Sequence, residues 1–257
     1  MSELFALTDL SWPGRFSGVT LTLEAGERVA LLGPNGAGKS SLLQAMAGLA
    51  APLRGSLRLA GQPLHALPPE QQALHRAWLP QQTDAPPALT GEQLLGMGRL
   101  PGQAHDADRV EQIIDTLELA PLLPLPLGTL SGGEQQRLQL GRVLVQSWAL
   151  RVDHPRALLL DEGLNALDVR HRMRLLNALT DWCDTGALSV VWISHDLTLA
   201  AQWAQRVWLM RAGQLLGEGR AETLTRKGLL TQAFDWPLTW RECDDMALLL
   251  PAQQPDA

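Results

Sequence analysis

The sequence is short of cysteine and has no long apolar run, and each shortage narrows what the chain can be. Only Cys183 and Cys243 occur among its 257 residues, and neither stands in a C-x-x-C pair or at the spacing of metal ligands. We therefore expect buried or idle thiols. No apolar stretch approaches the length of a membrane-spanning helix, so we expect a chain that does not cross a bilayer by itself.

Basic charge is scarce as well. The chain has 21 Lys and Arg residues against 27 Asp and Glu residues, which gives a formal net charge of −6. This balance argues against an extended basic surface for DNA or RNA, and we expect no nucleic-acid partner. The opening MSELFALTDL lacks a basic start followed by a long apolar segment, so we expect no secretory signal and a cytoplasmic protein.

What the sequence does contain is a succession of strand patterns. Residues 19–24 alternate apolar and polar side chains as a half-exposed strand does, and residues 55–64 indicate a short hairpin. Continuous apolar runs at 28–32, 156–161 and 188–194 are typical of central strands in a parallel sheet. These patterns predict a β-rich first part and a parallel sheet that resumes late in the chain.

Helical spacing dominates the middle of the chain. Three segments carry it, residues 90–98, 106–119 and 134–146, and a fourth helical pattern covers residues 169–182. After residue 220 the pattern indicates weak helical segments and a frayed end. The composition, 46% hydrophobic and 19% charged, is that of a globular protein. We therefore predict an α/β fold with a helical insertion.

A glycine-rich loop follows the first apolar run. The stretch GPNGAGKS at 33–40 meets the pattern G-x-x-x-x-G-K-[ST], between a predicted strand and a helix that begins near Ser40. Its three glycines permit backbone angles that let successive N–H groups form a concave anion site. Lys39 adds a mobile positive charge for the outer phosphates, and the Ser40 hydroxyl suits a magnesium ion. An ordinary glycine-rich turn is the alternative, but the flanking strand and helix favour a nucleoside triphosphate.

Two adjacent acids stand where a predicted buried strand leaves the sheet. Ligands collect at this edge of an open parallel sheet. Asp161 is placed to hold the magnesium through water, and Glu162 is placed to polarise an attacking water. The alternative is an acidic N-cap for the following helix. The phosphate loop favours the catalytic interpretation.

A second anion site is predicted at LSGGEQQR, residues 130–137. A serine and two glycines lead into a helix there, so backbone N–H groups and the helix dipole point at one place. In isolation this pattern is usually just a helix cap. Its interpretation depends on the other motifs of the chain.

Five motifs together resemble a known family. The phosphate loop 33–40, LSGGEQ at 130–135, LLLDE at 158–162, NALD at 165–168 and ISHD at 193–196 occur in the order and approximate spacing of ATP-binding cassette ATPases, the motor subunits of ABC transporters. The resemblance spans nearly the whole chain. It implies a single ABC ATPase domain over residues 1–257, with an α/β P-loop NTPase core, a mainly parallel sheet, an N-terminal antiparallel β subdomain and an inserted helical subdomain. The implied parts are 1–89 for the β subdomain and the first part of the core, 90–147 for the helical subdomain, 148–220 for the rest of the core and 221–257 for the tail.

The resemblance also implies roles for individual residues. In that family two cassettes sandwich two ATP molecules, each between the phosphate loop of one subunit and the serine-glycine motif of the other. Glu162 matches the general base, and His195 matches the histidine that contacts the γ-phosphate and helps to orient water. Gln81, in preference to Gln82, matches the glutamine that senses magnesium and the membrane partner, and Asp168 would lie at the dimer interface. The resemblance implies ATP and Mg²⁺ as cofactors, with Glu162, His195 and Lys39 as catalytic residues and Ser40, Gln81 and Asp161 as magnesium ligands. The residues implied to bind the nucleotide are Gly33, Pro34, Asn35, Gly36, Ala37, Gly38, Lys39, Ser40, Ser41, Gln81, Ser131, Gly132, Gly133, Glu134, Asp161, Asp168 and Trp12.

Two positions depart from the family's pattern or match it loosely. The family usually follows its catalytic glutamate with proline, whereas Gly163 stands here, and glycine loosens a turn that proline would stiffen. We expect an altered rate or dimer stability, with the chemistry retained. Trp12 is the candidate for the aromatic residue that stacks on adenine in many members, with a core or turn role as the alternative.

Finer resemblance points to importers. The segment between Ser131 and Asp161 is longer than in most cassettes, and with HRAWLPQQ at 75–82 and AGQLLGEG at 212–219 it looks most like the ATPases of bacterial cobalamin importers. Haem or ferric-siderophore importers are the alternative. The resemblance implies a homodimer on two transmembrane permease subunits, served by a periplasmic substrate-binding protein, at the cytoplasmic face of the bacterial inner membrane as a peripheral protein. A soluble cassette without a transport role, a regulatory cassette that does not hydrolyse ATP and an exporter are the competing interpretations.

Overall fold

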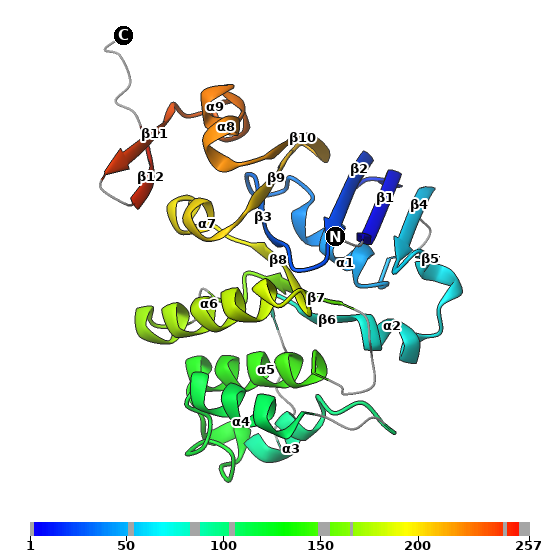
Figure 1. Ribbon diagram of the computed structural model, residues 1–257, viewed down its shortest axis with the longest axis vertical. Helices are drawn as coiled ribbons and strands as arrows, with labels where there is room; N and C mark the ends of the chain where they lie inside the picture. Colours follow the sequence, from blue (N-terminus) through cyan, green and yellow to red (C-terminus); the bar gives the residue numbers. More distant parts are fainter. Residues whose placement is uncertain are drawn as a thin grey trace.

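A six-stranded sheet forms the centre of the molecule (Figure 1). The computed structural model describes residues 3–50, 54–82, 88–102, 106–148, 155–164, 167–243 and 246–251. The strand order is β10-β9-β3-β8-β7-β6, and all neighbours are parallel except β10, which runs antiparallel to β9. The strands are β3 (Arg28–Leu32), β6 (Arg76–Leu79), β7 (Arg156–Asp161), β8 (Leu188–Ile193), β9 (Arg206–Arg211) and β10 (Gln214–Gly219).

The central strands are apolar throughout because both of their faces are covered. Every residue of β7 and β8 is buried. Successive residues point to opposite faces, so Leu158 and Leu160 of β7 join the core that reaches the helical part of the chain. Leu159 between them joins a second core, beneath the N-terminal sheet. The sheet therefore separates two hydrophobic cores, and the predicted parallel core is confirmed.

The N-terminal strands form a separate antiparallel sheet with the order β2-β1-β4-β5. One face of β2 is buried and the other is exposed, as its alternating sequence predicts. The strand expected at 19–24 and the hairpin expected at 55–64 are confirmed. The elements are β1 (Glu3–Trp12), β2 (Phe16–Glu24), β4 (Arg54–Leu59) and β5 (Gln62–Pro63).

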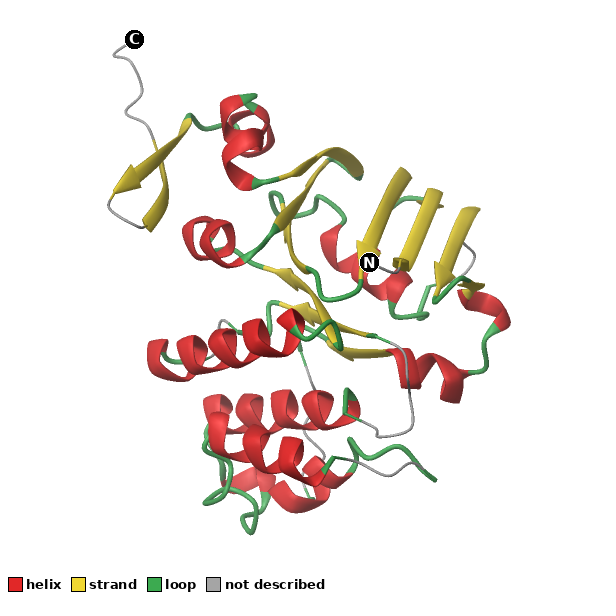
Figure 2. Ribbon diagram, in the orientation of Figure 1, coloured by secondary structure: helices red, strands yellow, loops and turns green. Residues whose placement is uncertain are grey.

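Three helices form a layer below the central sheet in the view of Figures 1 and 2. They are α3 (Gly91–Gly96), α4 (Ala107–Thr116) and α5 (Gly132–Gln146), and we call them the helical group. Each begins at a polar cap: Thr90 and Ser131 form capping boxes, and Asp106 accepts a hydrogen bond from the first turn of α4. These caps explain why the predicted helical insertion starts where it does.

The remaining helices cover the sheets. Helix α6 lies between the sheet and the helical group in Figure 1. Within the described residues, no helix combines the length and the apolarity needed to cross a membrane. The elements are α1 (Lys39–Met46), α2 (Pro69–His75), α6 (Val169–Asp184), α7 (Leu197–Trp203), α8 (Ala221–Arg226) and α9 (Leu229–Phe234), with short 3₁₀ turns at Leu64–Ala66 and Leu127–Thr129.

The tail after residue 220 is more ordered than its sequence indicates. Helices α8 and α9 match the weak helical patterns, but the chain continues into a hairpin of β11 (Leu238–Cys243) and β12 (Met246–Pro251). The Thr198 hydroxyl of α7 donates to the Leu249 carbonyl at 2.9 Å, and Leu249 is buried. Contacts with α7 therefore hold a hairpin where only weak helical segments were expected. Of the end that was expected to fray, residues 251–257, all but residue 251 lie outside the described residues.

Candidate functional site

The loop between β3 and α1 has a backbone that only glycine can form at two points. Gly33 has φ 147° and Gly38 has φ 96°. A Cβ at Gly33 would lie 2.1 Å from the Met210 carbonyl oxygen, and one at Gly38 would lie 2.9 Å from the Arg15 carbonyl oxygen. The neighbouring strand and turn thus approach the loop so closely that a side chain is excluded at both positions.

Lys39 is held inside this loop without a carboxylate partner. Its Nζ donates to the carbonyl oxygens of Gly33 at 2.8 Å and Pro34 at 2.9 Å, and the residue is 7% exposed. Burial lowers the pKa of Lys39, and the charges of Glu162 and Asp161 oppose that shift. Among the described residues no carboxylate lies within salt-bridge distance of Nζ. The ammonium is therefore oriented and available to an anion such as a phosphate.

A hydroxyl and a carboxylate meet beside the lysine. The Ser40 hydroxyl at the start of α1 donates to Asp161 Oδ1 at 3.1 Å, at the end of β7. Asp161 is buried, and its burial raises the pKa of the carboxyl while the Ser40 hydrogen bond lowers it. Hard oxygen donors of this kind are what Mg²⁺ prefers. The pair fits a magnesium ion that a phosphate group completes.

Glu162 follows Asp161 with its carboxylate held on both sides. Its Oε1 lies 2.7 Å from His195 Nε2, and its Oε2 accepts a hydrogen bond from Gln81 Nε2 at 3.1 Å. Glu162 has φ 59°, a left-handed conformation that is uncommon for residues other than glycine. The strained turn directs the carboxylate away from the strand and toward His195 and Gln81, which come from segments far apart in the sequence.

The phosphate loop and the Glu162 cluster line one open cavity of about 430 Å³. Loop residues 35–41, Gln81, Glu162 and His195 all border it. The structure thus brings together most of the loop residues assigned to phosphate with the residues assigned to catalysis and sensing, while Gly33 and Pro34 do not border this cavity. Asp161 joins it through its contact with Ser40. Gly14 and Arg15 also line the cavity. Sequence analysis missed both, since no motif marks the turn between β1 and β2.

Trp12 does not border this cavity. It stands at the end of β1, pairs with Phe16 across the turn to β2 and packs, partly buried, against the core beneath the N-terminal sheet. The turn residues Gly14 and Arg15 reach the cavity in its place. The geometry agrees with the core or turn role for Trp12, and stacking on adenine stays a prediction.

The serine-glycine motif lies at a different cavity. Ser131 caps α5: its N–H and its hydroxyl donate to Glu134 Oε2 at 2.8 and 2.6 Å. These hydrogen bonds hold the pKa of Glu134 below its usual range. Ser131, Gly133, Glu134 and Asp168 border an open cavity of about 330 Å³. The phosphate loop and the serine-glycine motif of one chain therefore line two separate cavities, and anion binding at the second stays a prediction.

Two further residues of this second cavity were not expected. Arg137 of α5 and His171 of α6 line it beside Asp168. Arg137 is the last residue of the LSGGEQQR stretch, which was the one available signal, whereas His171 has no motif of its own. Of the NALD motif, residues 165–166 lie outside the described residues.

The chain is similar to known proteins over most of its length. The sequence pattern of the ABC transporter family matches residues 16–165. The chain is 38% identical over 237 residues to the hemin import ATP-binding protein HmuV of Bradyrhizobium diazoefficiens, covering 91% of this chain and 88% of that protein. It is also 38% identical over 237 residues to the vitamin B12 import ATP-binding protein BtuD of Escherichia coli O45:K1, covering 91% and 92%.

Solved structures share the fold. The ATP-binding subunit of an ABC transporter superposes with a TM-score of 0.77 at 23% identity, covering 90% of this chain and 96% of that one. A chain of an ABC transporter in an inward-facing conformation also gives a TM-score of 0.77, at 22% identity, covering 98% and 99%. The predicted α/β fold, with a parallel core sheet and an antiparallel N-terminal sheet, is confirmed.

Proposed function

The chain belongs to the ABC transporter family of ATPases, with ATP as substrate and Mg²⁺ as cofactor, and from this premise we propose that it powers the import of cobalamin. Haem is the second candidate cargo, because a hemin importer's ATPase is as similar to this chain as the vitamin B12 importer's ATPase. Both cargoes are metal-centred tetrapyrroles. These similarities concern the motor subunit, so cargo selection would rest with the partner proteins.

The observation that carries the ATPase chemistry is the single cavity that joins Lys39, Glu162 and His195. We assign to Lys39 the binding of the outer phosphates, and to Ser40 and Asp161 the holding of Mg²⁺, which when bound neutralises phosphate charge. The Glu162 carboxylate would accept the proton of the attacking water. His195, 2.7 Å from Glu162, would hold that carboxylate and the water in line. The other loop residues, from Gly33 to Ser41, would surround the phosphates with backbone N–H groups.

The second cavity supports a two-copy arrangement. Ser131 and Gly133 line a different cavity from Lys39 of the same chain. In a symmetric dimer, the serine-glycine motif of one copy would face the phosphate loop of the other, and Asp168 would lie at the interface. ATP binding would then close the dimer, and hydrolysis would remove the group that joins its halves.

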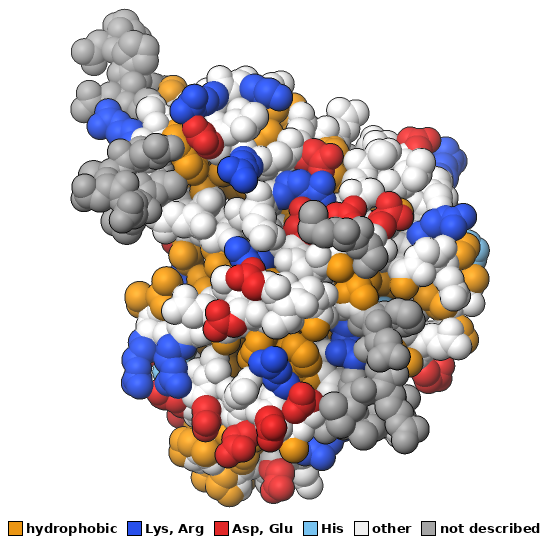
Figure 3. All heavy atoms as spheres, viewed as in Figure 1, with side chains coloured by type: hydrophobic (Ala, Val, Ile, Leu, Met, Phe, Trp, Pro, Cys, Tyr) orange, Lys and Arg blue, Asp and Glu red, His pale blue; other side chains and the backbone are white. Residues whose placement is uncertain are grey.

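We assign permease docking to the helical group and to the segment after Gln81, of which residues 83–87 lie outside the described residues. Between α3 and α4 lies a mainly apolar cavity, bordered by Leu95, Val110 and Ile114, with Glu92 and Arg99 at its rim. Neighbouring Met97 is 61% exposed. On the face in Figure 3, acidic side chains gather over this lower part of the molecule. A permease would dock here at the cytoplasmic face of the inner membrane, and a periplasmic binding protein would deliver the cargo. We also propose that the chain divides into its subdomains at residues 89/90, 147/148 and 220/221, as the family resemblance implies.

The test is uptake of labelled cobalamin and, in a separate arm, labelled haem, in the bacterium that carries this gene. Wild type is compared with a deletion, and with the deletion complemented by wild type, Lys39→Ala or Lys227→Ala. Lys227 is the chain's other lysine and is exposed, so its variant is the matched control. We expect wild type and Lys227→Ala to restore cobalamin uptake and Lys39→Ala to fail. Restoration of haem uptake alone would make haem the cargo, and normal uptake of both in the deletion would refute the proposal.

A further inference from the structure

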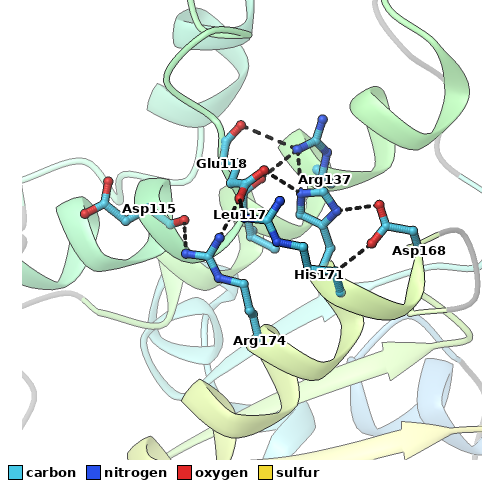
Figure 4. A network of polar contacts seen from close by, with 8 residues as sticks. Asp115, Leu117, Glu118, Arg137, Asp168, His171 and Arg174 are labelled. Atoms are coloured by element: carbon cyan, nitrogen blue, oxygen red, sulfur yellow. Dashed lines mark hydrogen bonds and ion pairs between the residues drawn. The ribbon is translucent and has the colours of Figure 1, made fainter.

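A polar network joins the helical group to α6 beside the second cavity (Figure 4). Its centre is His171, in the first turn of α6, with a side chain that is 12% exposed. Its partners come from three places: Asp168 caps α6, Arg137 lies on α5, and Glu118 follows the end of α4. No step of the proposed hydrolysis uses this network, yet His171 borders the same cavity as Ser131.

The histidine is held at both ring nitrogens. His171 Nδ1 lies 2.8 Å from Asp168 Oδ2, and the His171 backbone N–H donates to Asp168 Oδ1 at 2.8 Å. On the other side of the ring, Nε2 lies 3.1 Å from Glu118 Oε2 and 3.0 Å from Arg137 Nη1. Both oxygens of Asp168 are therefore taken up by one residue, which fixes the plane of that carboxylate.

The two nitrogens of the ring meet different elements. Nδ1 faces the Asp168 carboxylate, while Nε2 faces a donor, Arg137, and an acceptor, Glu118. Burial raises the pKa of Glu118, but His171, Arg170 and Arg174 outweigh it and leave the pKa below its ordinary value. Hydrogen bonds from His171 likewise lower the pKa of Asp168. Both carboxylates stay charged near neutral pH.

Glu118 is itself fixed by several partners. Its φ of 50° turns the chain sharply at the end of α4. Arg174 Nη1 donates to Glu118 Oε1 at 2.6 Å, and Arg137 Nη1 donates to the Leu117 carbonyl oxygen at 3.1 Å. Arg170 Nη2 lies 2.7 Å from Glu118 Oε1. The end of α4 is thus bound to both α5 and α6.

These contacts tie together two groups that face the same cavity from different elements. Ser131 caps α5, and Arg137 lies about one and two-thirds turns further along that helix. Asp168 caps α6. We propose that His171 is a positioning residue that holds Asp168 and the serine-glycine motif in fixed relation, so that one copy presents them to the other copy's nucleotide as a single rigid half-site. This inference rests on the two-copy arrangement proposed above.

The proposal predicts a separation between two kinds of binding. ATP binding to the phosphate loop of a single chain does not involve His171, because Lys39 and His171 border different cavities. Closure of the dimer does involve it. His171→Ala is therefore expected to weaken dimer formation and lower kcat, each by about tenfold, the effect of losing one member of a contact network. The affinity of the monomer for ATP should stay within about twofold.

The experiment measures the full-length chain with Mg²⁺. Sedimentation velocity with a non-hydrolysable ATP analogue gives the dimer Kd, a fluorescent ATP analogue at low protein concentration gives the monomer affinity, and steady-state hydrolysis gives kcat and KM. His171→Gln keeps a donor and an acceptor in one amide and should recover part of the loss. Glu118→Gln removes the other anchor with no change in volume and should act in the same direction as His171→Ala.

Arg172→Ala is the matched control. Arg172 lies next to His171 on α6, and within the described part of the chain no side-chain hydrogen bond or ion pair is formed by it. Its variant should match wild type in every measurement. The inference is overturned if His171→Ala and Glu118→Gln dimerise and turn over like wild type. It is equally overturned if monomer affinity and melting temperature fall in step with kcat, which would mean a merely structural role. Failure of wild type to dimerise with the analogue would instead refute the two-copy arrangement.

Discussion

Replacement of Gly163 by alanine should destabilise the fold, because the space beside it is already filled. A Cβ at this position would lie 2.4 Å from Leu79 Cδ2, and Leu79 is fully buried at the end of β6. Gly163 has no left-handed backbone angle, so the cost is one of packing alone. Overpacking of a buried site costs about 1–3 kcal/mol. For a chain of this size that corresponds to a fall in melting temperature of about 2–12 °C. A proline Cβ would meet the same methyl group, which is a physical reason for the absence of proline here.

The assay is thermal unfolding followed by circular dichroism, in a double-mutant cycle with Leu79→Ala. Removing the Leu79 methyl groups should make Gly163→Ala cost less than about 0.5 kcal/mol, as the clash would be gone. Gly96→Ala is the control: a Cβ there meets nothing within 4 Å, so this helical site should tolerate alanine. If Gly163→Ala lowered the free energy of unfolding equally in the wild type and in Leu79→Ala, the packing argument would be refuted.

Three further predictions follow from charge and burial. The double reversal Glu92→Arg with Arg99→Glu should lower uptake while leaving the ATPase rate of the isolated protein intact; loss of that rate would count against docking at the helical group. Burial raises the pKa of the Cys183 thiol to about 12, so iodoacetamide at pH 8 should leave it unmodified in the folded protein, as mass spectrometry can check. The pKa of Glu134 is lowered in the folded state, so its contribution to stability is complete above its ordinary value of 4.5 and is lost as pH falls through the folded value. Glu134→Gln should therefore flatten the acid limb of a plot of melting temperature against pH, and an unchanged limb would contradict this.

Elements with strong local signals were predictable. A strand that is buried on both faces needs a continuous apolar run, as β7 has. The unpaired N–H groups of a helix's first turn need polar caps, as Thr90 and Ser131 provide, so both kinds of element can be located in the sequence within a few residues. The hairpin β11–β12 was missed because its contacts with α7 supply what its own sequence lacks. Strands β6, β9 and β10 were not predicted for a similar reason, because hydrogen bonds to neighbouring strands of the sheet define them.

The sequence by itself determined the chemistry of the phosphate loop. Its glycines, Lys39 and Ser40 are contiguous, so the local backbone alone builds the anion site. Tertiary structure alone decided which distant residues join it. Glu162, His195 and Gln81 meet because parallel strands end at one edge of the sheet, and β6, β7 and β8 lie side by side there.

The second cavity depended even more on tertiary structure. Its histidine looked ordinary in the sequence, since the partners of His171 come from α4, α5 and α6, and Glu118 lies 53 residues away. A residue's role at such a junction is set by which helices pack together, and helix packing reflects the shape of whole faces. The motifs therefore predicted two anion sites in one chain, and only the packed fold decided that the two motifs line separate cavities and which side chains surround each.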